Sequence, residues 1–135
     1  MKTKILTLFL VAGCVFLMAS SCEVTTANLT DVAMCSETQE FKCAEETDTF
    51  ATTTPIIYCT AVLNNAVEGT QVTASWYYLE EGETFIDAAA IEASDPTMDL
   101  EFSLSKPTND WPVGNYRVDL QVGSEAPVST EFEVQ

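Results

Sequence analysis

The chain has 135 residues, which is enough for one ordinary domain, and it carries 21 Asp and Glu against 5 Lys and Arg. Its formal net charge of −16 argues against nucleic acid or an anionic membrane surface as a partner, because both recruit clustered cations. The chain has no histidine, and this removes Ser–His and Cys–His catalysis and His-ligated zinc sites.

Residues 1–21 have the features of an export signal. Lys2 and Lys4 precede an apolar run over residues 5–18, and small residues then lead to Cys22. The run is shorter than the roughly 20 apolar residues of a transmembrane helix. Because a small-residue site followed by Cys resembles a bacterial lipobox, we expect residues 1–21 to be removed and Cys22 to be lipidated as the first mature residue.

Two other cleavage patterns stay open. Cys14 follows Val-Ala-Gly, a closer lipobox by sequence, but cleavage there would leave a very short apolar segment. Ordinary cleavage after Ser21 also fits the small-x-small rule. The expected location is therefore outside the cytoplasm, as a membrane-anchored lipoprotein at the cell surface or in the periplasm, and otherwise as a secreted protein. Contact with the membrane would occur only through a lipid anchor at Cys22.

The rest of the chain has the pattern of an antiparallel β protein. An opening strand is expected over residues 28–35, followed by a polar segment, 36–53, that crosses an end of the fold. Apolar residues then recur with a period of two in five segments, and turn-forming residues separate them: 57–63, 72–78, 100–104, 116–122 and 128–134. Residues 86–93 include three consecutive alanines and are expected to form an irregular connecting strand. This alternation is typical of sheets with one buried face.

About seven short strands over residues 28–135 predict a single all-β domain, an immunoglobulin-like antiparallel β-sandwich. Trp76 falls where such sandwiches bury a tryptophan on the strand after Cys59. Tyr116, two residues before the inward position Val118, matches the tyrosine corner of these folds. Val118 replaces the cysteine of antibody domains, so Cys59 lacks its usual disulfide partner.

Four segments also carry a family resemblance. Residues 59–66 and 69–78, then the Trp-Pro-Val-Gly-Asn-Tyr-Arg-Val run of 111–118 and the closing Phe-Glu-Val of 132–134, are similar to uncharacterised bacterial secreted or lipid-anchored domains. The resemblance covers roughly residues 28–135. It implies a fibronectin- or immunoglobulin-like sandwich outside the cytoplasm, and it implies no catalytic or binding residues.

Exported proteins can keep disulfides, and the expected bridge joins Cys35 to Cys59. It would fasten the opening strand to the next long strand and contribute about 3 kcal/mol by restricting the unfolded chain. A Cys35–Cys43 bridge is the alternative. A cysteine metal site is disfavoured, since the chain offers neither His nor a Cys-x-x-Cys pair.

The functional prediction is a non-enzymatic cell-envelope interaction or structural module, without catalytic residues, metal or cofactor. Its partner would be a protein or a glycan outside the cytoplasm. The densest carboxylates, Glu80, Glu81 and Glu83, read as an exposed hairpin tip and so as weak acid–base groups. Tyr77 and Trp111 are candidate ligand contacts, although Trp111 can equally close an open end of the core. The alternative function is a surface module that binds carbohydrate or calcium.

Overall fold

The computed structural model describes residues 26–135, and these residues form ten β-strands and no helix. Seven strands have seven or more residues and three have only two. None of the described residues therefore belongs to a helix that could cross a membrane. In chain order the strands are β1 (Asn28–Cys35), β2 (Thr38–Gln39), β3 (Lys42–Cys43), β4 (Thr49–Phe50), β5 (Ile56–Asn64), β6 (Gln71–Tyr78), β7 (Thr84–Glu92), β8 (Met98–Ser105), β9 (Gly114–Val122) and β10 (Val128–Val134).

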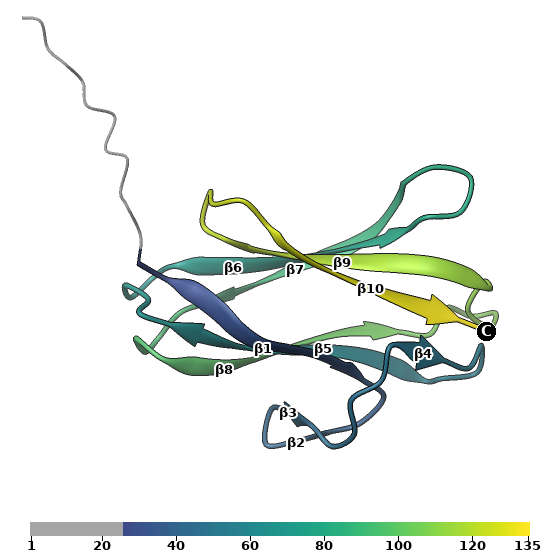
Figure 1. Cartoon of the computed structure of the whole chain (residues 1–135), viewed down its shortest axis with the longest axis horizontal. Helices are drawn as coiled ribbons and strands as arrows, with labels where there is room; N and C mark the ends of the chain where they lie inside the picture. Colours follow the sequence, from purple (N-terminus) through teal and green to yellow (C-terminus); the bar gives the residue numbers. More distant parts are fainter. Residues whose placement is uncertain (1–25) are drawn as a thin grey trace, which may run out of the picture.

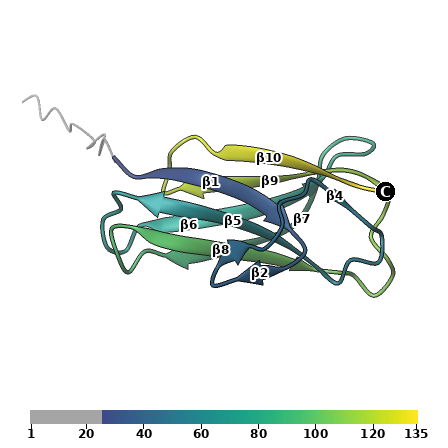
Figure 2. The ribbon, with the colours of Figure 1, turned by 60° about the horizontal axis from the view of Figure 1, so that its bottom comes forward.

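Two sheets pack face to face, which confirms the predicted all-β sandwich (Figure 1). One sheet has the order β1-β5-β8 and the other β4-β10-β9-β6-β7. All pairings within them are antiparallel except β4–β10, which is parallel. The short β2–β3 hairpin forms a third, separate pair. Strands that are distant in sequence, such as β1 and β10, lie near one another on the same side of the molecule (Figure 2).

The core lies between the sheets and follows the predicted alternation. Every second residue of β5, β6, β8 and β9 is buried, because successive side chains in a strand point to opposite faces. Trp76 is 2% exposed and meets Phe132 edge to face, with ring centroids 6.1 Å apart. The ring of Tyr116 stacks on the ring of Phe132, with ring centroids 5.1 Å apart. The predicted inward positions of Trp76 and Tyr116 are therefore confirmed.

The segment 86–93 is more regular than its sequence suggests. It belongs to β7, a nine-residue strand that pairs along β6 with one bulge between Trp76 and Tyr77. β7 stands at the end of the five-stranded sheet, and most of its side chains are exposed. An edge strand does not need a continuous apolar face, which explains why the alternation in this segment is weak.

The polar segment after β1 takes a different course from the one expected. From the sequence, residues 36–53 are expected to cross an end of the sandwich. The first part of this segment instead forms the β2–β3 hairpin, which lies on the outer side of the β1-β5-β8 sheet. Thr38 donates a hydrogen bond to Glu101, and Lys42 pairs with Asp99 at 3.2 Å. Both acceptors lie on the outward face of β8, opposite its buried leucine and phenylalanine residues.

The predicted Cys35–Cys59 bridge is wrong: the disulfide joins Cys35 to Cys43, and Cys59 is a buried free thiol. The register of β1 on β5 gives the reason. Cys59 lies opposite Met34, whereas Cys35 lies opposite Tyr58. Since residues directly opposite share a face and neighbours alternate, Cys35 and Cys59 point to opposite sides of the sheet. Cys35 thus meets the hairpin outside, and Cys59 faces the core.

Candidate binding surfaces

The candidate ligand contact Trp111 closes an end of the core. Its side chain is 4% exposed, and the indole Nε1 donates to the Thr54 carbonyl at 2.6 Å. Its backbone N–H donates to the Thr52 carbonyl at 2.9 Å. Because these two hydrogen bonds hold it in place, Trp111 is a buried part of the fold and not an exposed stacking platform. Cys22, the predicted lipidation site, lies outside the described residues.

Tyr77 lies on the outward face of the five-stranded sheet, between two other side chains. Phe85 meets its ring edge to face at 5.8 Å, and the Arg117 guanidinium lies over the ring at 4.6 Å. Arg117 is in turn paired with Glu83 and, at 2.8 Å, with Asp119. The hydrogen bond that Arg117 donates to Glu83, followed by the one that it donates to Asp119, raises the pKa of Arg117. Tyr77 is therefore half-covered by its neighbours, and Phe85, 57% exposed, is the most accessible ring of this cluster.

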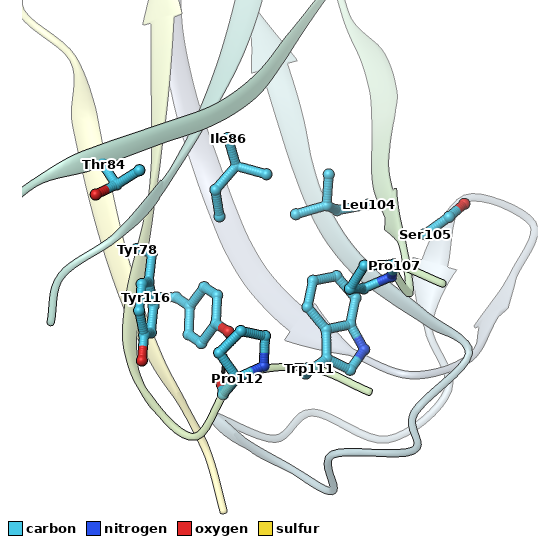
Figure 3. Close-up of a pocket in the computed structure, with 9 residues that line it drawn as sticks. All are labelled: Tyr78, Thr84, Ile86, Leu104, Ser105, Pro107, Trp111, Pro112 and Tyr116. Atoms are coloured by element: carbon cyan, nitrogen blue, oxygen red, sulfur yellow. Dashed lines mark hydrogen bonds between the residues drawn. The ribbon is translucent and has the colours of Figure 1, made fainter. Parts of the chain in front are cut away.

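A cavity of about 270 Å³ opens between the edges of the two sheets, where β7 faces β8. Ile86 and Leu104 point toward it from these two strands, and aromatic rings close the other side (Figure 3). The bulge that shifts the β6–β7 register places Ile86 here while Phe85 stays on the outer face. The full lining is Tyr78, Thr84, Ile86, Leu104, Ser105, Pro107, Trp111, Pro112 and Tyr116.

The polar atoms of the aromatic rings in this cavity are all used within the chain. The hydroxyl of Tyr78 donates to the Val113 carbonyl at 2.7 Å, and that of Tyr116 donates to the Pro112 carbonyl at 2.6 Å. Burial, and next the charge of Tyr78, raise the pKa of Tyr116 to about 12, so the phenol keeps its donor proton at neutral pH. With the Trp111 N–H also bound, the cavity presents mainly carbon to an incoming group.

The carboxylates of the β6–β7 loop take structural roles. Glu80 accepts hydrogen bonds from the backbone N–H of Asn115 at 2.9 Å and from its side-chain amide at 3.3 Å. This contact needs a glycine at position 114, because a Cβ there would lie 2.4 Å from the Glu80 side chain. Glu83 instead binds Arg117. Across residues 26–135 no three Cys, Asp or Glu side chains are gathered as a metal site would need.

Neither the cavity nor the position of β7 at the edge of its sheet was predicted from the sequence. The cavity is built from four strands and a loop, and no local motif marks it. The one signal for β7 is Ala88-Ala89-Ala90, three small residues that stay exposed in the folded domain. Such a run is unusual in a buried strand and is compatible with an edge.

The comparisons with known proteins bear on the fold. No family model and no curated protein matches the chain. Among solved structures, a mutant β-glucosidase from Listeria innocua in complex with laminaribiose is similar at 8% identity and a TM-score of 0.50, over 82% of this chain and 16% of that chain. A β-glucosidase from Erythrobacter marinus gives the same identity and coverage with a TM-score of 0.51. At this identity the similarity concerns the architecture of a small part of those enzymes and carries no activity to this chain.

Proposed function

We propose that this protein is a non-enzymatic, exported cell-envelope module with an immunoglobulin-like sandwich that acts by binding another macromolecule. The strand order supports the fold assignment: β1, β5 and β8 correspond to strands A, B and E, and β6, β9 and β10 to C, F and G. The Tyr116 hydroxyl bond to the backbone four residues upstream is the contact that defines a tyrosine corner.

The observation that carries the binding role is the aromatic-lined cavity beside an exposed apolar edge. Ile86 lines the cavity and is 38% exposed, and Phe85, its neighbour in β7, is 57% exposed on the outer face of the same strand. Pockets for drug-sized ligands usually measure about 300–1,000 Å³, so about 270 Å³ suits one or two side chains better than a whole ligand. Exposed apolar groups around such a hollow are typical of surfaces that meet a partner.

The disulfide supports the proposed location. Cys35–Cys43 would persist in an oxidising compartment, and disulfides are rare in reducing ones. The proposed anchor is a lipid on Cys22, which would hold the domain at the membrane without any contact from the sandwich itself. The chain has a net charge of −16, and removal of residues 1–21 with Lys2 and Lys4 would leave −18; this charge fits an envelope domain that is soluble and is kept away from anionic lipid surfaces.

The alternative, binding of a glycan, is less well supported by the cavity. Sugar recognition needs free hydrogen-bond groups beside aromatic rings, and the phenol and indole groups here already bind backbone carbonyls. A polypeptide side chain needs only the apolar surface.

Photo-crosslinking in exporting cells tests the proposed function. A benzophenone amino acid is placed at Phe85, the exposed residue of β7 that precedes the cavity-lining Ile86. The matched control carries it at Val67, which is 73% exposed in the loop at the opposite end of β6. We expect a discrete protein adduct from position 85 and none from position 67. Binding on a glycan array together with no protein adduct at position 85 would favour the carbohydrate alternative, and adducts of equal yield at both positions would contradict a specific surface.

A further inference from the structure

We propose that the partner contributes an extended segment that adds as a strand to the free edge of β7 and inserts one apolar side chain into the neighbouring cavity. The segment carries Lys or Arg beside that apolar residue. This inference rests on the proposed function and specifies its partner chemistry and docking mode.

The edge of β7 is open and long. β7 is the terminal strand of the five-stranded sheet and pairs only with β6 among residues 26–135. Edge strands are usually protected by Lys, Pro or shortness, because their unpaired N–H and C=O groups can pair with another chain. The nine residues of β7 include neither Lys nor Pro, and the one bulge in its pairing with β6 lies at Phe85–Asp87, so residues 88–92 form a regular free edge. The opposite edge strand, β4, has only two residues.

The centre of β7 leaves room for a neighbour. Ala88, Ala89 and Ala90 are exposed and too small to block an approaching backbone. The Ala88 N–H donates to the carboxylate of Asp87 at 2.8 Å, so this donor is held by a neighbouring side chain that can be displaced. In an antiparallel strand both backbone groups of one residue point the same way, so the free groups recur at Ala88 and Ala90.

The cavity lies within reach of an added strand. Thr84 and Ile86 belong to β7 and also line the cavity, so its mouth runs along this edge. A paired strand would lie about 4.8 Å from β7, and every second side chain would point toward the β8 side. Backbone pairing would provide affinity, and the cavity would select the side chain, which is the division found in strand addition generally.

The charges near the edge determine the partner's flanking residues. Asp87 and Glu92 lie on β7, and Glu80 and Glu81 lie in the loop that leads into it, whereas Glu83 of this loop is already paired with Arg117. The described cations Lys42, Lys106 and Arg117 each already pair with a carboxylate. A second copy of this acidic chain would be repelled, whereas Lys or Arg in the segment would be attracted, with a range of about 8 Å at physiological salt.

The test selects nine-residue peptides from a phage-displayed random library on the wild-type domain. The matched variants are Ala88→Pro, which removes the edge donor, and Ala88→Thr, which keeps it; Pro is tolerated on edge strands. Circular dichroism checks that each variant is folded, and Ile86→Glu, at the cavity mouth, serves as a second blocking variant. We expect enriched peptides to have one apolar residue near Lys or Arg. Their binding should fall at least about tenfold with Ala88→Pro and with Ile86→Glu and stay unchanged with Ala88→Thr.

Amide hydrogen exchange supplies the second measurement. Peptide binding should slow amide exchange at Ala88 and Ala90, on the free edge of β7. Equal binding to wild type and Ala88→Pro, enrichment of acidic peptides, or β7-dependent self-association of the chain would overturn the proposal. If the cellular adduct at Phe85 persists undiminished in Ala88→Pro, the interaction module stands and strand addition fails. If no adduct forms, the proposed function itself fails.

Discussion

Trp76 lies in the core of the sandwich and contacts Phe132, from the same sheet, edge to face. Replacing it with alanine should lower the free energy of unfolding by about 3–5 kcal/mol, because a large buried side chain is lost and a cavity is left. Urea denaturation measures the change. Tyr77→Ala, at the adjacent, half-covered position, is the control and should lower it far less. A Trp76→Ala loss below about 1 kcal/mol would contradict the buried role.

The free thiol of Cys59 is fully enclosed by the core, and this burial raises its pKa from 9.0 to about 12. Because the thiolate is the reactive form, Cys59 should be inert to thiol reagents at pH 8 in the folded domain and reactive in urea. Ellman titration of a domain that begins at residue 23, and therefore contains neither Cys14 nor Cys22, checks this. One thiol reacting at the same rate without urea would contradict the buried position.

The same shift predicts how stability depends on alkaline pH. The folded state keeps the thiol protonated more strongly than the unfolded state, so its contribution is fully present below pH 9 and is lost as pH rises toward 12. Burial raises the pKa of Tyr116 from 10.0 to about 12, so its contribution to stability is lost in the same way as pH rises above 10. Urea denaturation between pH 8 and 12 should therefore give a shallower decline in the Cys59→Ala variant than in wild type; parallel declines would contradict the assignment.

At the scale of elements, the turn of the β2–β3 hairpin has backbone angles that its two residues disfavour. Its two turn residues, Glu40 and Phe41, have φ angles of 49° and 64°, and Phe41 is 58% exposed. Two-residue turns with positive φ favour Asn-Gly, and a bulky residue in this region is unfavourable by roughly 1–3 kcal/mol. The Cys35–Cys43 bridge at the base of the hairpin holds the turn in place.

Phe41→Gly should therefore raise the free energy of unfolding by about 1 kcal/mol, since glycine adopts positive φ without steric conflict. Chemical denaturation under oxidising conditions measures it. Phe85→Gly is the matched control, because Phe85 is 57% exposed but lies within a strand, and it should destabilise the domain. A loss of stability in Phe41→Gly would mean that the Phe41 ring makes a favourable contact.

At the scale of the whole molecule, the membrane anchor is a prediction from residues outside the described part of the chain. Cys22→Ser should leave an unprocessed precursor and abolish lipid modification, because the lipobox cysteine is both the cleavage signal and the acceptor. Membrane fractionation with globomycin-treated cells as a control, followed by intact mass, measures it. A mature protein that begins with an unmodified Cys22 would contradict lipidation and indicate simple secretion.

The alternation of residues along β5, β6, β8 and β9 determined the all-β class and the inward side of each strand, because the face on which a side chain lies is a local property of an extended chain. Trp76 and Tyr116 could be placed in the core for the same reason. Only the tertiary structure decided the disulfide. The register between β1 and β5 places Met34 opposite Cys59, and this turns Cys35 to the other face of the sheet, away from Cys59. It also decided that β7 has a free edge and that Ile86, Leu104 and Trp111 enclose a cavity, because these relations join residues that only the packing of the two sheets brings together.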